Sequence, residues 1–91
     1  MFKTLEELIA VIRQRRDSST DESYTNKLLN NKRLSVEKVK EEIAELIDAI
    51  GKNSNKVHEA ADVLYHLMVL LEANGIKIED VMDELKKRQK K

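Results

Sequence analysis

The chain contains no cysteine and no proline, and only two of its 91 residues are glycine. Without cysteine it can form neither a disulfide nor a metal site built on thiolates, and we expect it in a reducing compartment, the cytoplasm. Because so few residues interrupt a helix, the composition predicts a protein that is helical throughout.

Neither sign of charge is in excess, since 17 lysines and arginines balance 17 aspartates and glutamates. This balance argues against nucleic acid or an anionic membrane as the main partner. The N-terminal segment "MFKTLEELIAVIRQRR" carries acids within its apolar run, so it is not a secretory signal, and no apolar run is long enough to span a bilayer. The length predicts a single domain over residues 1–91, a size that often gains stability from oligomerisation or a metal.

Helical periodicity and polar interruptions divide the chain into about five helices. A capping-box pattern at Thr4 and Glu7 marks the expected start of the first, and residues 17–22 form a polar loop after it. Ser35 is the expected N-cap of the longest helix. The first two expected helices cover residues 4–16 and 23–30, and the third runs from 35 to about Gly51. The fourth is capped by Ser54 or Asn55 and runs to Asn74, and the fifth covers residues 76–91. The sequence therefore predicts an all-α fold, a helical bundle with short connections.

The stretch "EKVKEEIAELIDAI" (37–50) places Glu41, Glu42 and Glu45 close together on one predicted helix. On a helical wheel, at about 100° per residue, Glu41 and Glu45 are neighbours and Glu42 lies at the edge of the same face. The opposite side carries Val36, Val39, Ile43, Leu46, Ile47 and Ile50. Taken alone, this pattern favours a helix with an apolar side toward the core and a solvated acidic side.

The stretch "EAADVLYHLMVLL" (59–71) argues against that interpretation. Glu59, Asp62 and His66 form one narrow stripe on a helix that is otherwise apolar nearly all round, and such a helix is buried. Buried carboxylates need a partner, which is either a lysine or arginine from another helix or a cation held between facing helices. Carboxylate oxygens suit Mg²⁺, or Mn²⁺, and His66 reads as a hydrogen-bonded core residue that supports the acids.

A magnesium ion commonly bridges phosphate oxygens, so cations near the acids acquire a possible role. Lys38 shares the wheel face of Glu41 and Glu45, Lys27 lies upstream, and Arg16 ends the first helix. Each alone is an ordinary surface charge. Beside an acidic metal site, together they predict a rim that binds phosphate.

Four blocks in order resemble the phosphoribosyl-ATP pyrophosphohydrolase family: "SYTNKLL" (23–29), "KVKEEIAE" (38–45), "EAADVLYHLMVLL" (59–71) and "GIKIEDVMDELKKR" (75–88). The family belongs to the all-α NTP pyrophosphohydrolases, whose signature is Glu-Glu-x-x-Glu followed by Glu-x-x-Asp. In this chain the signature falls on Glu41, Glu42, Glu45, Glu59 and Asp62. The chain departs from the family where Lys40 and the turn "NNKRL" lack the usual glycines and where no proline precedes "SYT".

The resemblance implies hydrolysis of phosphoribosyl-ATP to phosphoribosyl-AMP and pyrophosphate, the second step of histidine biosynthesis, by a homodimer whose two chains complete the bundle. The five signature acids would bind Mg²⁺, with Glu42 taking the proton of the attacking water and Glu45 essential for turnover. Lys27, Lys38 and Arg16 would contact the phosphates, and His66 would support the ligands. Two alternatives stay open: a housecleaning pyrophosphohydrolase of (d)NTPs, and a non-catalytic helical dimerisation module.

Overall fold

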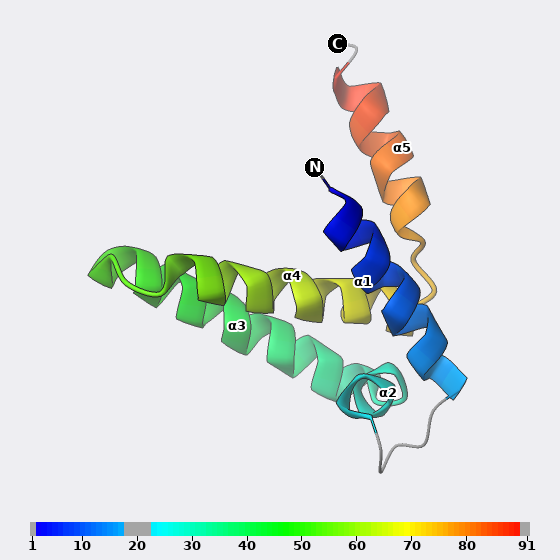
Figure 1. The fold of residues 1–91 in the computed structure, drawn as a ribbon, viewed down its shortest axis with the longest axis horizontal. Helices are drawn as coiled ribbons and strands as arrows, with labels where there is room; N and C mark the ends of the chain where they lie inside the picture. The colour runs from blue at the N-terminus through cyan, green and yellow to red at the C-terminus, as the bar shows by residue number, and fades with distance from the viewer. Residues whose placement is uncertain (1, 18–22, 90–91) are drawn as a thin grey trace.

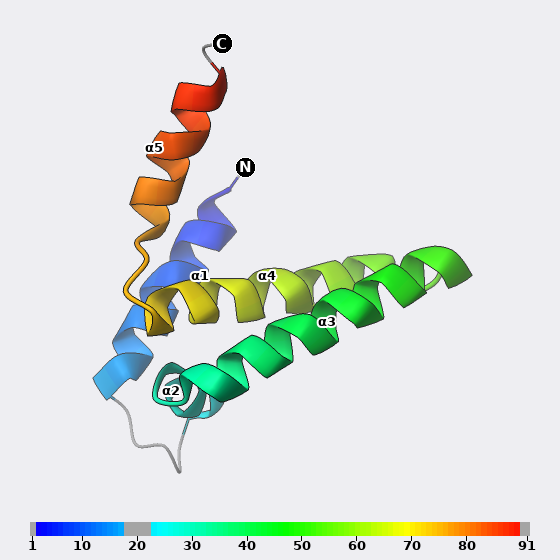
Figure 2. The same cartoon turned by 180° about the vertical axis from the view of Figure 1, so that it is seen from behind.

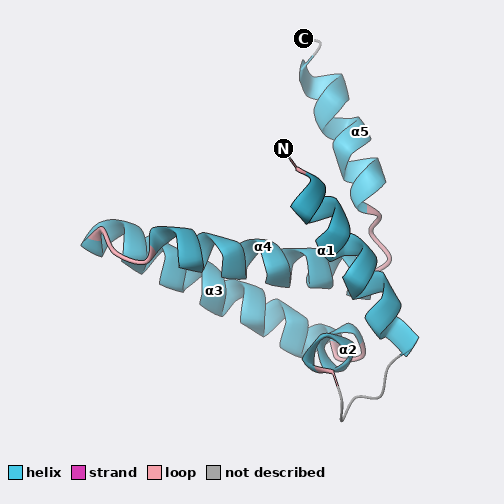
Figure 3. Cartoon of the chain, viewed as in Figure 1, coloured by secondary structure: helices cyan, strands magenta, loops and turns pink. Residues whose placement is uncertain are grey.

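In the computed structural model, which describes residues 2–17 and 23–89, every regular element is a helix (Figures 1 and 3). The elements are α1 (Lys3–Gln14), a short 3₁₀ helix η1 (Arg15–Asp17), α2 (Tyr24–Leu29), α3 (Lys32–Lys52), α4 (Lys56–Ala73) and α5 (Ile78–Gln89). The prediction of an all-α fold with about five helices is confirmed. Residues 18–22 of the expected polar loop lie outside the described part of the chain.

The two longest helices, α3 and α4, form an antiparallel hairpin that is the most extensive packing in the molecule (Figure 1). The short α2 lies beside the N-terminal end of α3 and contacts α4 as well. Helix α1 crosses the C-terminal end of α4, at the same end of the hairpin as α2, and α5 follows α4 there. Both α1 and α5 extend on the same side of the hairpin, as both views show (Figure 2). Among the described residues, no helix has the length and apolar character needed to cross a membrane.

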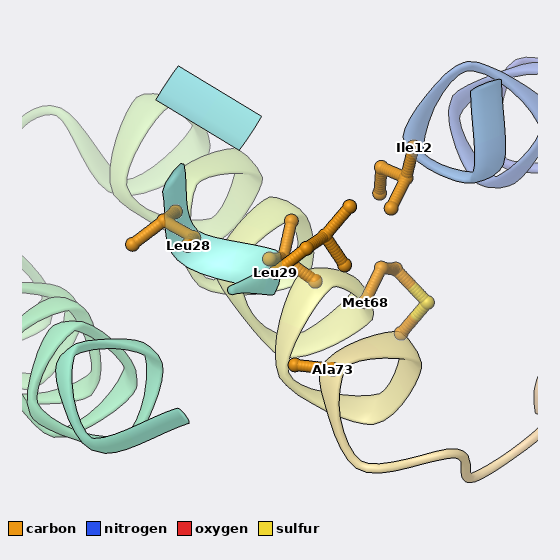
Figure 4. Packing of buried hydrophobic residues seen from close by; sticks show 6 residues of the cluster. Ile12, Leu28, Leu29, Met68 and Ala73 are labelled. Carbon is orange, nitrogen blue, oxygen red and sulfur yellow. The ribbon is translucent and has the colours of Figure 1, made fainter. Parts of the chain in front are cut away.

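The hydrophobic core lies where α1, α2 and α4 meet (Figure 4). Ile12, Leu28 and Val69 are completely buried there. Complete burial of one such side chain contributes roughly 1.5–3 kcal/mol to the free energy of folding, so this junction holds α2 firmly against α4. The remaining buried members are Leu29, Met68 and Ala73.

Three details of the predicted helix ends are wrong. Helix α3 begins at Lys32, and its N-cap is Asn31, whose side chain accepts a hydrogen bond from the backbone N–H of Leu34 at 3.1 Å. Ser35 is instead buried inside the helix, and its hydroxyl donates to the carbonyl of Leu28 at 2.6 Å. The N-cap position of α1 is Phe2, without a side-chain cap, so Thr4 and Glu7 form no capping box. Gly51 lies within α3, which ends at Lys52.

The orientation of α3 also differs from the wheel interpretation. Helix α3 buries Val39, Glu42 and Ala49, while Ile43, Ile47 and Ile50 are 42%, 65% and 58% exposed. The acidic edge of the helix therefore faces α4, and most of the apolar side is turned away from the chain. A contiguous apolar surface of this kind often marks a place where another molecule binds.

Candidate metal centre

Three carboxylates from two helices converge in the α3–α4 hairpin. Glu42 and Glu45 lie one turn apart on α3, and Glu59 lies in the first turn of α4. One carboxylate oxygen of each lies within 4.8 Å of one oxygen of both others. The hairpin produces this convergence because the end of α3 and the start of α4 are adjacent across a short connection.

Among the described residues no cationic side chain pairs with these three carboxylates, of which Glu42 is buried, Glu59 half-buried and Glu45 exposed. The Oε2 atoms of Glu42 and Glu59 are buried and accept no hydrogen bond. None of the ion pairs within residues 2–17 and 23–89 involves Glu42, Glu45 or Glu59. An unpaired buried carboxylate is strongly unfavourable unless it takes up a proton or a cation.

The pKa values of two of the carboxylates are raised by their surroundings. Burial raises the pKa of Glu42, and the neighbouring charge of Glu45 raises it further, while the imidazole of His66 opposes the shift. Burial also raises the pKa of Glu59, and the neighbouring carboxylate of Glu45 acts in the same direction. Two acids with raised pKa values beside a third acid form a site that a divalent cation would stabilise.

A second group of possible ligands adjoins the first. His58, Glu59 and Asp62 also have ligand atoms within 4.8 Å of one another. Asp62 Oδ2 lies 3.5 Å from Nε2 of His58, on the same exposed edge of α4. Glu59 belongs to both groups. Apart from the imidazole of His58, the donors are carboxylate oxygens, which are the ligands that hard divalent cations prefer.

The remaining predicted residues lie at different distances from this centre. Glu41 is exposed and its carboxylate lies 3.4 Å from Nζ of Lys38. Lys27 is exposed on α2. Arg16 donates to the carbonyl of Glu72 at 2.9 Å, and Glu72 lies more than three turns beyond Glu59, roughly 20 Å at about 1.5 Å per residue. The structure therefore does not bring Arg16 to the carboxylates.

Two hydrogen bonds of His66 involve residues of α2 and α4. His66 is buried, with Nδ1 2.8 Å from the carbonyl oxygen of Asp62 and Nε2 3.1 Å from the hydroxyl of Tyr24. Burial raises the pKa of Tyr24, and the charge of Lys38 opposes the shift. The sequence offered no signal that distinguished this role of Tyr24 from ordinary packing, because the contact spans 42 positions of the chain.

The site is open to solvent through a pocket of about 220 Å³ at the α3–α4 connection. Glu45 and Glu59 line this pocket together with Asp48, Ala49, Lys52, Ser54 and Asn55. Sequence reasoning did not place Lys52 at the site, and it considered Ser54 only as a helix cap, because both residues lie in a polar connection between helices. The opening means that an ion or a ligand can reach the carboxylates without a change of fold.

Comparison with known proteins relates the chain to one family of enzymes. The sequence model of the family described as phosphoribosyl-ATP pyrophosphohydrolase matches residues 5–89. The chain is 42% identical to a phosphoribosyl-ATP pyrophosphatase of Clostridium novyi (96% of this chain, 82% of the relative). It is 44% identical to one of Pyrobaculum arsenaticum (97% of each chain). A bifunctional histidine biosynthesis protein of Pyrococcus furiosus is 40% identical over 94% of this chain, which covers 41% of that longer protein.

Proposed function

The chain belongs to the phosphoribosyl-ATP pyrophosphohydrolase family, and from this premise we propose that it hydrolyses phosphoribosyl-ATP with its three converging carboxylates at the centre of the reaction. Water adds across the α–β phosphoanhydride, the bridging P–O bond breaks, and phosphoribosyl-AMP and pyrophosphate leave. The observation that carries the proposal is the pair of buried, unpartnered Oε2 atoms of Glu42 and Glu59.

We propose that Glu42, Glu45 and Glu59 hold Mg²⁺, with Asp62 completing the set from the adjoining group. When bound, the cation would neutralise phosphate charge and lower the pKa of water. Glu42 is the candidate proton acceptor, through a carboxylate oxygen that the cation does not engage. Lys38, whose Nζ lies 3.4 Å from the carboxylate of Glu41, and the exposed Lys27 are the candidate residues for contacting phosphate oxygens.

The direct test measures pyrophosphate released from phosphoribosyl-ATP by the purified chain in Mg²⁺ or in a chelator. We expect turnover only with Mg²⁺, and Glu45→Gln should abolish it without changing the helical content seen by circular dichroism. Glu37→Gln, on an exposed part of the same helix, is the matched control and should stay active. Full activity of Glu45→Gln contradicts the ligand assignment, and faster release from dNTPs contradicts the substrate.

We also propose that a second copy of the chain covers the apolar side of α3. Val36, Ile43, Ile47 and Ile50 form one stripe along this helix, and all four are at least 39% exposed. A chain of 91 residues buries a limited share of its surface alone, so association would supply the missing burial. A homodimer formed through this stripe would leave the acidic edge of α3 facing α4.

Ile47→Asp is expected to convert the dimer to a monomer, because it places a charge at the most exposed position of the stripe. Size-exclusion chromatography with light scattering measures the mass directly. Glu37→Gln, exposed on the same helix about a quarter turn away from the stripe, should leave the mass unchanged. A wild-type chain that is monomeric at micromolar concentration would contradict the proposed homodimer.

A further inference from the structure

Helix α3 carries a lysine on either side of the carboxylate site, in line with Glu45. Lys38 precedes Glu45 by seven residues and Lys52 follows it by seven, so the three residues share one face of the helix. Each interval is two turns, roughly 10 Å at about 1.5 Å per residue. The carboxylates therefore lie between two cations of the same helix face, and these two cations are in different surroundings.

Lys52 lies where the hairpin turns, at the end remote from α1, α2 and α5 (Figure 1). Helix α3 ends at this residue, and α4 starts at residue 56. Asn53 and Asn55 both adopt the left-handed backbone conformation, which asparagine tolerates better than most residues, so the connection turns sharply. The turn brings Lys52 to the same pocket of about 220 Å³ that Glu45 and Glu59 line.

Within the described part of the chain, Lys52 is the one cationic side chain that lines this pocket. Its Nζ lies 3.1 Å from Oδ2 of Asp48, one turn back on α3, and Asp48 lines the pocket too. An ammonium group has three hydrogens to donate, so this ion pair leaves donors for a second acceptor. The hydroxyl of Ser54 and the side chain of Asn55, which makes no capping hydrogen bond, add neutral groups to the same pocket.

The size and charge of the pocket limit what it can hold. Sites for drug-sized ligands enclose roughly 300–1,000 Å³, and this pocket encloses about 220 Å³. It suits a compact group such as a diphosphate better than a nucleoside that carries a second ribose. An anion there would lie beside the carboxylates of Glu45 and Glu59, so it needs both the proposed Mg²⁺ and the ammonium of Lys52 to offset their charge.

We propose that Lys52 binds the β- and γ-phosphates of the substrate and that the pocket at the α3–α4 connection holds the pyrophosphate product. The substrate would lie along α3 with its triphosphate end toward Lys52 and its ribose-bearing part toward Lys38 and α2. Pyrophosphate could then leave without passing the rest of the substrate. This inference rests on the proposed function, and it adds the direction in which the substrate is bound.

The test measures the binding of inorganic pyrophosphate to the full chain by isothermal titration calorimetry, with Mg²⁺ or with a chelator. Lys52→Gln removes the cation, Lys52→Arg keeps it, and Lys38→Gln removes the cation at the other end of the helix face. Lys56→Gln is the matched control, because Lys56 is exposed in the first turn of α4 and does not line the pocket. Glutamine and lysine have similar helix propensities, so the helical content should not change.

We expect pyrophosphate to bind in Mg²⁺ and Lys52→Gln to weaken this binding roughly tenfold or more, because a charge-assisted hydrogen bond is lost. Lys52→Arg should lose less, and Lys56→Gln should bind as wild type does. Lys38→Gln should also keep its affinity for pyrophosphate, but its KM for phosphoribosyl-ATP should rise. The Kd of Lys52→Gln for Mn²⁺ alone should not increase, because Lys52 is not a metal ligand.

Wild-type affinity of Lys52→Gln for pyrophosphate overturns the inference. A loss confined to Lys38→Gln also overturns it, because the substrate would then lie in the opposite direction. Equal losses in Lys52→Gln and Lys56→Gln overturn it as well, since any nearby positive charge would have the same effect. A wild-type chain that hydrolyses no phosphoribosyl-ATP but binds pyrophosphate through Lys52 refutes the proposed function instead, and it leaves the pyrophosphate site in place.

Discussion

Glu42→Gln is expected to reduce Mg²⁺-dependent pyrophosphate release by at least about a hundredfold while leaving the metal-free protein as stable as wild type or more stable. The two effects have one cause. The Glu42 side chain is almost fully buried, its Oε2 has no partner, and burial and Glu45 raise its pKa. Glutamine has nearly the same shape without the charge, so the variant removes the repulsion together with the ligand.

The opposite signs of the two effects make the experiment informative. A residue whose role is structural would lose activity and melting temperature together when it is replaced. Glu37→Gln, on an exposed part of α3, should change neither quantity. If Glu42→Gln melts well below wild type in the absence of metal, the buried carboxylate must have a stabilising partner, and the account of the site given above is wrong.

The fold followed from the sequence because few residues compete with helix formation and because the helix boundaries carry polar residues. The stripe of Glu59, Asp62 and His66 was predicted to be buried, and of these residues the structure buries His66, whereas Glu59 and Asp62 are half-buried. The helix starts were less legible. Asn31 and Ser35 are both good caps, and the choice depends on Ser35 bonding to Leu28, a contact between helices that periodicity does not contain.

The rotation of α3 could not be read from its own wheel. Its apolar side is the wider one, and a single helix of that pattern would turn it inward. The wheel of α3 contains no information about α4. The acidic edge of α3 would face the acidic residues of α4 if both helices bound one cation. Arg16 illustrates the same limit, because the first helix ends in several basic residues and only the tertiary structure pairs this one with Glu72.

The stability of the metal-free chain should rise as pH falls from the raised pKa values of Glu42 and Glu59 toward 4.5, and Mg²⁺ should reverse this trend. The pKa values of Glu42 and Glu59 are raised above the ordinary value of 4.5. Between 4.5 and the raised values the folded chain binds more protons than the unfolded chain, so unfolding becomes less favourable as pH falls through this window. Glu79 acts in the opposite direction, but Arg13 lowers its pKa to about 2, so its stabilising effect is lost only below about pH 4.5.

Protons and Mg²⁺ compete for the same carboxylates, so the rise in melting temperature caused by Mg²⁺ should be large above the raised pKa values of Glu42 and Glu59 and should shrink as pH falls below them. At a hundred times its Kd an ion adds about 2.7 kcal/mol to the unfolding free energy, which for a domain of this size is about 10 °C or more. Melting curves at several pH values, with Mg²⁺ or with a chelator, measure both trends. In Glu42→Gln both should flatten, whereas Glu37→Gln should retain them. A melting temperature that is independent of Mg²⁺ at pH 8 would mean that the converging carboxylates of α3 and α4 do not share a cation.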